Sequence, residues 1–322
     1  MTSALIIRPS SLGDIVHALP VVHDLTQHFP GIAIDWVAEQ PFAGLVVLNS
    51  GVRRVIPVAL RRWRHRLLAR ETWREFAAFR RELARERYTA VIDMQEQVKG
   101  ALIARLARGP VHGPDRASIR EPVATLAYRH AHRVDPAQHL IDRCRALAGA
   151  AFGFVPEGAP RFGLAPPALD TGPDGRFAVF LHSTSRADKL WPDSHWRELI
   201  AHVTRAGIRV ELPWGTRDEA ARSATLAAGV DGALVPLQRT LPQMAALLAR
   251  AEFVCGVDTG LVHLAAALGV PTIALFISTD PRLAGVERAS ARARDLGDAN
   301  RIPTPSEVIA ALGELMRAAP TC

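Results

Sequence analysis

Polar residues gather in four segments of the sequence, each directly after a short apolar run. The segments are Ser10–Asp14, His182–Pro192, Leu212–Glu219 and Asp258–His263. Short apolar runs are typical of buried parallel strands, and ligands of parallel sheets bind beyond the carboxyl ends of the strands. We therefore interpret the four segments as candidate site loops.

Asp14 stands at the start of a predicted helix, directly after Gly13. A carboxylate there can be a first-turn acid that the helix dipole favours, and this is the common structural role. It can also be a general base that takes a proton from an acceptor hydroxyl, and the glycine before it would let a substrate approach. Both roles remain open at this point.

The second segment combines hydroxyls with one of the chain's two lysines. Of 39 basic residues only Lys99 and Lys189 are lysine, so these positions could need a compact ammonium in place of a planar guanidinium. Thr184, Ser185 and Lys189 together offer donors suited to a pyrophosphate. A polar surface loop is the structural alternative.

Asp258-Thr259-Gly260 opens a predicted helix, and His263 lies one turn further on. The free N–H groups and positive dipole of a helix amino terminus favour anions, which predicts a phosphate site here. The alternative is a capping Asp258 and a packed core histidine. Glu219 could likewise contact a ribose or serve only as a first-turn helix acid.

Metal and disulfide chemistry find little support. The sequence contains no Asp-x-Asp pair that could hold a metal ion, so we expect no metal and no cofactor. Lys189 and the amides at a helix end would then stabilise a leaving diphosphate. The three cysteines, Cys144, Cys255 and Cys322, are too far apart for a Cys-x-x-Cys site, which favours a reducing compartment. The amino terminus shows no signal-peptide pattern, and we expect a cytoplasmic protein.

The elements that must position these residues alternate between strand and helix. Strands are predicted at 4–7, 33–37, 55–58, 90–93, 177–181, 208–212, 253–257 and 272–276. Helices are predicted at 14–28, 74–87, 97–106, 195–205, 218–227, 241–249, 261–268 and 306–318. This alternation predicts parallel sheets covered by helices on both faces. No G-x-G-x-x-G turn or P-loop follows any strand, which disfavours nicotinamide, flavin and P-loop chemistry.

Five prolines lie between residues 155 and 175, a composition typical of a linker. We predict a Rossmann-like domain over 1–155, a linker over 156–176 and a second Rossmann-like domain over 177–322, whose last helix could return to the first domain.

Residues 259–277 contain no Asp, Glu, Lys or Arg, but Gly269-Val270-Pro271 breaks this run. A buried helix and strand explain it better than a membrane span.

The formal net charge of +7 is uneven along the chain. Residues 53–87 hold twelve Arg and four Glu, an excess of +8 in that segment. Such a segment can attract nucleic acid, lipid head groups or a phosphorylated substrate, or it can be a solvated helix face. A nucleic-acid or membrane-binding protein is thus a second hypothesis, although it leaves Asp14, Lys189 and His263 without a purpose.

The combined motifs resemble the ADP-heptose:lipopolysaccharide heptosyltransferases, glycosyltransferase family 9, over about residues 5 to 281. The resemblance rests on the Ser10–Asp14 segment, Pro57 to Arg64, Arg120-Glu121-Pro122, Asp188-Lys189 before Trp191-Pro192, Leu212-Pro213-Trp214-Gly215, and Asp258-Thr259-Gly260 with His263. Arg61-Arg62-Trp63-Arg64 favours the type I enzymes over type II. Glu96 and Ile277-Ser278 depart from the residues usual in the family.

The resemblance implies a GT-B fold, with parallel sheets facing an interdomain cleft, an acceptor-binding first domain and an ADP-sugar-binding second domain. It implies inverting transfer of L-glycero-D-manno-heptose from ADP-heptose to Kdo of Kdo-lipid A, with peripheral contact to the cytoplasmic face of the anionic inner membrane and no nucleic-acid partner. Type II transfer to the heptosylated core is the alternative. Asp14 resembles the general base. Residues that resemble donor contacts are Thr184, Ser185, Lys189, Glu219, Asp258, Thr259, Gly260 and His263. Expected acceptor contacts are Ser10, Gly13, Arg61, Arg62, Arg64, Lys99 and Arg120.

Overall fold

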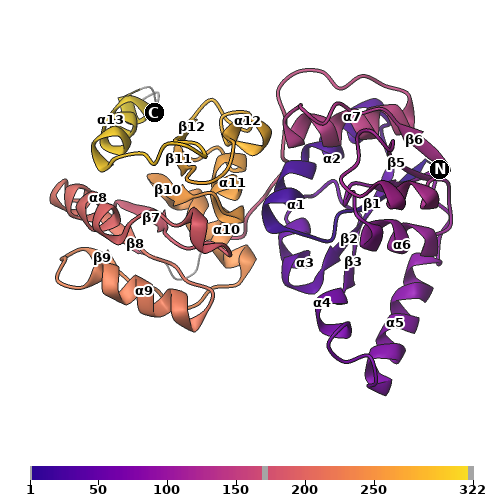
Figure 1. Cartoon of the computed structure of the whole chain (residues 1–322), viewed down its shortest axis with the longest axis horizontal. Helices are drawn as coiled ribbons and strands as arrows, with labels where there is room; N and C mark the ends of the chain where they lie inside the picture. Colours follow the sequence, from indigo (N-terminus) through magenta and orange to yellow (C-terminus); the bar gives the residue numbers. More distant parts are fainter. Residues whose placement is uncertain (1, 169–172, 318–322) are drawn as a thin grey trace. The chain divides into compact units, whose positions relative to one another are not determined.

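The computed structural model describes residues 2–168 and 173–317 and divides into two compact units (Figure 1). The units are Met1–Ala165 and Pro166–Cys322. The division falls inside the segment 156–176 that was predicted as a linker, of which residues 169–172 lie outside the described part. Cys322 and Ala318, the predicted end of the last helix, also lie outside it.

The first unit is built on six strands in the order β3-β2-β1-β4-β5-β6, and every neighbouring pair is parallel. The strands are β1 Ser3–Ile7, β2 Ala33–Glu39, β3 Arg54–Val58, β4 Ala90–Asp93, β5 Val111–Pro114 and β6 His130–His132. Strands β1, β2 and β4 are buried along their whole length, as the continuous apolar runs predicted. Sequence patterns did not predict β5 and β6.

Helices of the first unit cover both faces of this sheet. They are α1 Leu12–Ala18, α2 Pro20–His28, α3 Gln40–Val46, α4 Leu60–Trp63, α5 Arg70–Leu83, α6 Val98–Leu106, the 3₁₀ segment η1 Pro122–Ala127 and α7 Leu140–Phe152. The single helix predicted over 14–28 is wrong. It is two helices, because Pro20 has no N–H to continue the ladder of α1 and instead begins α2. The arginine-rich helix α5 begins and ends about four residues earlier than predicted.

The second unit repeats the arrangement, with strand order β12-β11-β10-β7-β8-β9 and parallel pairing throughout. Its strands are β7 Phe177–Leu181, β8 Arg209–Glu211, β9 Ala233–Leu234, β10 Phe253–Val257, β11 Thr272–Leu275 and β12 Ala293–Leu296. Its helices are η2 Ala187–Lys189, α8 Asp193–Arg205, α9 Arg217–Ala227, α10 Leu241–Arg250, α11 Gly260–Ala267, α12 Pro281–Ala284 and α13 Pro305–Arg317.

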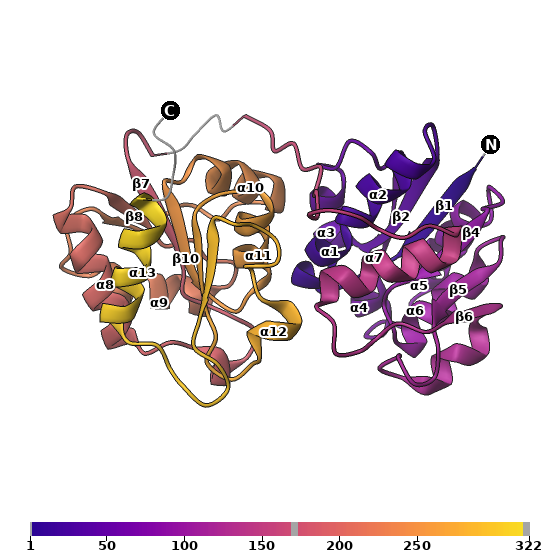
Figure 2. The same ribbon diagram turned by 90° about the horizontal axis from the view of Figure 1, so that it is seen from above.

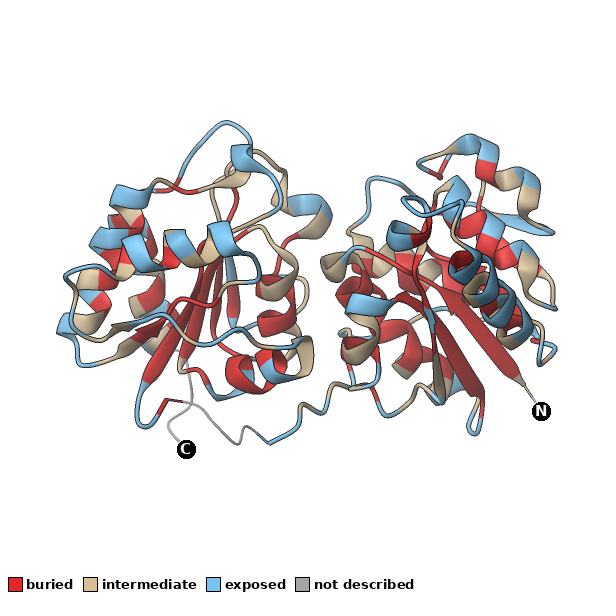
Figure 3. Ribbon diagram, turned by 90° about the horizontal axis from the view of Figure 1, so that it is seen from below, coloured by how far each residue is buried: buried red, intermediate tan, exposed pale blue. Residues whose placement is uncertain are grey.

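Both units share one topology. Counted from the first strand of each unit, the spatial order is 3-2-1-4-5-6, the order of a doubly wound Rossmann sheet. In the first sheet β2 and β3 lie on one side of β1, and β4 to β6 lie on the other side. The switch point of this sheet, where the strand order reverses, is therefore between β1 and β4. The switch point of the second sheet is between β7 and β10. Figure 3 shows both sheets buried between helices whose outer faces are exposed. The predicted α/β class of two Rossmann-like domains, the domain pair of the GT-B architecture, is confirmed.

The last helix, α13, packs within the second unit. It contacts α8, β11 and β12, and Val308, Leu312 and Leu315 enter the core there (Figure 2). The uncharged stretch 259–277 forms α11 and β11, as predicted. No helix in the described ranges is long and apolar enough to cross a membrane.

Candidate active site

Asp14 lies in the first turn of α1, beyond the carboxyl end of β1 and thus beside the switch point of the first sheet. Its Oδ2 accepts hydrogen bonds from the backbone N–H and the hydroxyl of Ser11, both at 2.8 Å. Its Oδ1 lies 3.1 Å from a guanidinium nitrogen of Arg8, and about a third of the carboxyl side chain is exposed. The carboxylate completes a capping box with Ser11, which is the structural role considered from sequence, and it still reaches solvent; its role as a base stays a prediction.

A second strand end supports this loop. Asp93, the last residue of β4, is buried, and its two oxygens accept from the Tyr128 hydroxyl at 2.8 Å and the Gln95 N–H at 2.9 Å. Gln95 in turn accepts from the Ser10 N–H at 3.2 Å. Burial raises the pKa of Asp93 to about 7, although both hydrogen bonds lower it. Asp93 thus fixes the segment that precedes Asp14.

Lys99, from α6, joins the same cluster. Its ammonium donates to the Ser10 hydroxyl at 3.2 Å. Burial lowers its pKa, as do the charges of Arg61 and Arg8, while Glu39 and Asp14 oppose the shift. The structure therefore brings the predicted residues Ser10, Asp14, Lys99 and Arg61 into one electrostatic cluster, which suits an anionic substrate.

A pocket of about 350 Å³ opens beside Asp14. Arg8, Arg120 and Arg143 line it together with Glu96 and Gln95. The predicted acceptor residue Arg120 therefore shares a cavity with the predicted base. Arg143, from α7, was not predicted; it lies 47 residues after Glu96, and only the packing of α7 against β4 brings it here.

Glu96 adopts a backbone φ of 58°, the left-handed region that glycine prefers. Its carboxylate pairs with Arg143 at 2.6 Å, and both side chains are largely buried. The pair neutralises the negative charge of Glu96 in the lining of the pocket beside Asp14. A glycine would relieve the backbone conformation but would leave Arg143 without this partner.

The arginines after β3 have separate environments. Arg61 donates its N–H to Glu39 at 3.2 Å, and its guanidinium lies 5.5 Å from the centre of the Phe42 ring. Arg62 forms two hydrogen bonds with Glu75, at 3.0 and 2.8 Å. Arg64 is exposed, and none of the contacts found in the described residues joins Arg62 or Arg64 to the Asp14 cluster. Their acceptor role stays a prediction.

In the second unit, Asp258 is the centre of the corresponding cluster at the carboxyl end of β10. Its Oδ2 accepts from the Lys189 ammonium at 2.5 Å and the Thr279 hydroxyl at 2.8 Å, and its Oδ1 lies 3.3 Å from His263 Nε2. Burial raises the pKa of Asp258, but His263 and Lys189 outweigh it and hold the pKa well below its usual range. The ionised carboxylate thus orients the lysine.

Lys189 keeps donor capacity toward a ligand. An ammonium has three N–H donors, and Asp258 takes one of them. The hydroxyl of Thr184 donates to the Asp258 carbonyl at 3.2 Å, so the loops after β7 and β10 are joined at this point. Ser185 is exposed beside them, and α11 begins at Gly260 with Thr259 as its N-cap. Cationic, hydroxyl and helix-end donors therefore gather at the second switch point, an arrangement that can bind a diphosphate.

Glu219 serves as a helix-capping residue. Its Oε2 accepts from the N–H groups of Gly215 and Thr216, at 2.7 and 3.0 Å, and Thr216 caps α9 in return. The structural role considered from sequence is therefore present. A ribose contact through Oε1 stays a prediction.

Three further residues position the loops around Lys189 and Asp258, and sequence patterns did not predict this role for them. The Arg222 guanidinium donates to the carbonyls of His182 and Trp191, at 2.5 and 3.0 Å, and so ties both ends of the loop that carries Lys189. His182 is buried and bonded to Ser223 at 2.8 Å; burial lowers its pKa to about 4. Thr279, in a segment that departs from the family pattern, reaches Asp258. The position of Thr279 after a predicted strand is the only sequence feature that could have indicated its role. No feature of the sequence indicates the role of Arg222.

No group of three or more His, Cys, Asp or Glu side chains within residues 2–168 and 173–317 is arranged to hold a metal ion. Cys144 and Cys255 are buried free thiols. Burial raises the pKa of the Cys144 thiol to about 12, so this thiol is unreactive at neutral pH.

Comparison with known proteins points in one direction. A family model described as Glycosyltransferase family 9 (heptosyltransferase) matches residues 76–304. Lipopolysaccharide heptosyltransferase 1 of Escherichia coli K12 is 44% identical over 285 residues, which span 87% of this chain and 89% of that protein. The protein of the same name from Pseudomonas aeruginosa is 42% identical over 284 residues, 87% of this chain and 80% of that protein.

Solved structures agree. E. coli heptosyltransferase WaaC with ADP superposes with a TM-score of 0.90 and 39% identity, and the match covers 98% of this chain and 100% of that one. WaaC with ADP-2-deoxy-2-fluoro heptose gives 0.87 at the same identity, covering 97% and 99%. With two Rossmann-like units and a polar cluster at each switch point, this chain is a glycosyltransferase that belongs to glycosyltransferase family 9, the heptosyltransferases.

Proposed function

We propose that the protein transfers L-glycero-D-manno-heptose from ADP-heptose to Kdo of Kdo-lipid A, with inversion at the anomeric carbon. The observation that carries this proposal is the Lys189–Asp258 cluster at the second switch point, in a chain 39% identical to a heptosyltransferase solved with ADP and with an ADP-heptose analogue. The names of the relatives at 42% to 44% identity favour type I transfer over type II.

On the donor side, Lys189 would donate to the diphosphate while Asp258 holds the ammonium in position. The first-turn amides of α11, from Gly260 onward, add the positive end of a helix. These groups stabilise the negative charge that grows on ADP as the glycosidic bond breaks. We propose that they do so without a metal ion.

On the acceptor side, Asp14 would take the proton from a Kdo hydroxyl as its oxygen attacks the anomeric carbon. Arg8 and Ser11 keep the carboxylate oriented for this step. Arg120 and Lys99 would bind anionic groups of the acceptor. We further propose that the protein works in the cytoplasm at the anionic surface of the inner membrane, where a lipid-linked acceptor lies, and that it has no nucleic-acid partner.

The proposal is tested by transfer assays with purified ADP-heptose and two acceptors, Kdo-lipid A and its heptosylated product. Type I activity predicts transfer to the first and none to the second. Transfer only to the heptosylated product would instead establish type II activity. Absence of transfer to both, by a protein that still binds ADP-heptose, would overturn the proposed acceptor while leaving the donor site standing.

A further inference from the structure

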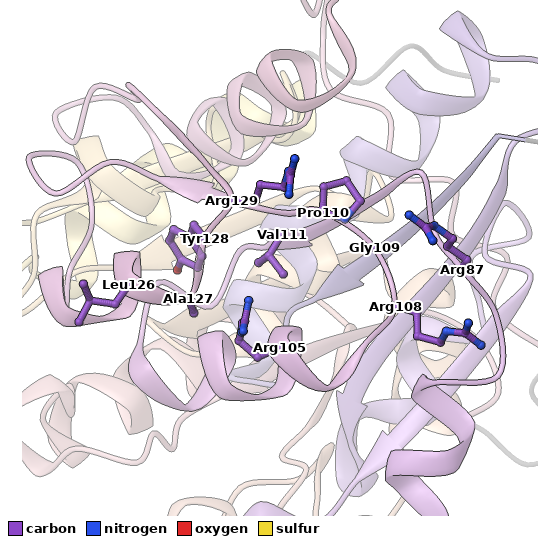
Figure 4. A pocket seen from close by; sticks show the side chains of 10 residues that line it. All are labelled: Arg87, Arg105, Arg108, Gly109, Pro110, Val111, Leu126, Ala127, Tyr128 and Arg129. Atoms are coloured by element: carbon purple, nitrogen blue, oxygen red, sulfur yellow. The ribbon is translucent and has the colours of Figure 1, made fainter.

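A second group of cations lies at the amino ends of the strands of the first sheet, whereas Asp14 lies at the carboxyl ends. Arg87, Arg108 and Arg129 precede β4, β5 and β6, and Arg105 lies in the last turn of α6. They surround a pocket of about 660 Å³, whose walls include Leu126 and Tyr128 (Figure 4). This pocket is separate from the one beside Asp14, because it opens at the amino ends of the strands.

The backbone holds the arginines close together. Arg87 and Arg108 form a parallel β-bridge, and the Tyr88 N–H donates to the Arg108 carbonyl at 2.8 Å. The Arg129 N–H donates to the Val111 carbonyl at 2.8 Å, one strand further along. At Gly109 a Cβ would lie 2.7 Å from the Tyr88 carbonyl, so this approach requires glycine.

No acidic side chain in the described part of the chain balances these four arginines. The pocket is lined by no Asp or Glu, and within the described ranges none of the four forms an ion pair. Three arginines of the basic segment are instead neutralised: Arg53 and Arg54 pair with Asp35, and Arg62 with Glu75. Like charges held side by side repel one another, so an unbalanced group of this kind is suited to an anion.

Exposed aliphatic side chains extend from this pocket, where Leu126 lines the wall, along α6 and η1. Val98, Leu102 and Arg105 are spaced i, i+4 and i+7 and share one face of α6, where Leu102 is 63% exposed. Val123 and Leu126, on the neighbouring η1, are 64% and 80% exposed. The α6–η1 face, defined as these five residues with Arg87, Arg108 and Arg129, therefore combines arginines that form no ion pair in the described part of the chain with exposed apolar side chains.

We propose that the α6–η1 face docks on the surface of a bilayer that contains anionic phospholipid, with the arginines on the phosphates and the aliphatic side chains among the upper acyl carbons. Charge complementarity and the aliphatic character carry this assignment. A protein surface that binds single-stranded nucleic acid would present exposed aromatic rings for stacking on bases. The exposed large side chains of this face are instead aliphatic. Tyr128, the aromatic residue in the pocket wall, donates its hydroxyl to Asp93. The purpose of docking rests on the proposed function, because a lipid-linked acceptor lies in that surface.

The test is flotation of the full chain with vesicles of phosphatidylcholine alone or with about a third phosphatidylglycerol, without donor or acceptor. We expect binding only to the anionic vesicles, weakening as salt is raised. Arg105→Ala with Arg129→Ala should weaken it about 25-fold, taking about fivefold for each arginine. Leu126→Ser should weaken it with no change in net charge.

The matched control is Arg80→Ala with Arg81→Ala, which removes the same charge from exposed positions of α5. This variant should bind within about threefold of wild type. Equal losses in the two double variants would overturn the proposal, since total charge or the α5 segment would then be responsible. A third outcome concerns inorganic pyrophosphate. If wild type binds it and the Arg105/Arg129 variant does not, while both proteins bind vesicles equally, the lipid assignment is overturned in favour of a free phosphate ligand.

Transfer assays separate this inference from the proposed function. The Arg105/Arg129 variant should lose activity on acceptor embedded in anionic vesicles but keep it on a deacylated, water-soluble acceptor. If wild type transfers to neither acceptor, the proposed function fails, and vesicle binding still decides whether the face docks.

Discussion

Replacing Lys189 by Met removes the ammonium from the Asp258 cluster and keeps most of the side-chain volume. Both side chains of the pair are about 15% exposed, so Asp258 stays largely shielded from water after the substitution. It retains Thr279 at 2.8 Å and His263 at 3.3 Å. The experiment asks whether the lysine serves only this cluster or also binds diphosphate.

The two roles predict different magnitudes. Loss of one partner from a buried pair costs about 3–5 kcal/mol when the other charge is left alone. Because Asp258 keeps two partners, we expect a loss of about 1–3 kcal/mol in the free energy of unfolding, seen as about 3–10 °C in the Tm of the second unit. A charge-assisted hydrogen bond to phosphate is worth about 1.5–3 kcal/mol, so the Kd for ADP should rise about 10- to 150-fold.

Asp258→Asn is the control variant. It removes the negative charge from the cluster and should also lower the Tm, but its amide oxygen can still accept a hydrogen bond from the Lys189 ammonium and hold it in position for phosphate. Its Kd for ADP, measured by calorimetry on folded protein, should stay within about threefold of wild type or fall. If Lys189→Met binds ADP as tightly as wild type, the phosphate role is refuted, whatever the change in stability. Equal weakening by both variants would reduce Lys189 to a structural residue.

Three further outcomes are expected. Asp14→Asn should lower kcat about 100- to 10,000-fold and leave ADP binding unchanged; transfer near the wild-type rate would remove Asp14 as the base. Because burial raises the pKa of Asp93 to about 7, the folded protein holds a proton there that the unfolded chain releases near pH 4. Stability should therefore fall by up to about 4 kcal/mol as the pH rises from about 4 to 7, and urea unfolding of Asp93→Asn should lack this slope. Glu96→Gly relieves the φ of 58° and frees Arg143, so KM for a phosphorylated acceptor should fall about tenfold; an unchanged KM would show that Arg143 does not contact the acceptor.

Local patterns in the sequence were enough to predict the framework. Continuous apolar runs such as Phe177–Leu181 identify strands because a parallel strand is buried on both faces. Polar groups after those runs identify the loops of Asp14, Lys189 and Asp258, since the topology places such loops at one edge of each sheet. Pro20 shows the limit of the pattern: the apolar periodicity continues through it, but the helix does not.

Partners between distant residues were decided only by the tertiary structure. Asp258 and Lys189 are 69 residues apart, and Asp93 and Tyr128 are 35 apart, so no local spacing could indicate either pair. The basic segment 53–87 reads as one charged patch, yet folding pairs Arg53 and Arg54 with Asp35 and places Arg87 beside Arg108, with no acidic partner among the residues that the structure describes. Sequence sets which charges exist and which elements carry them. Strand order and packing decide which charges meet, because electrostatic and hydrogen-bond energies depend on distances that only the folded chain defines.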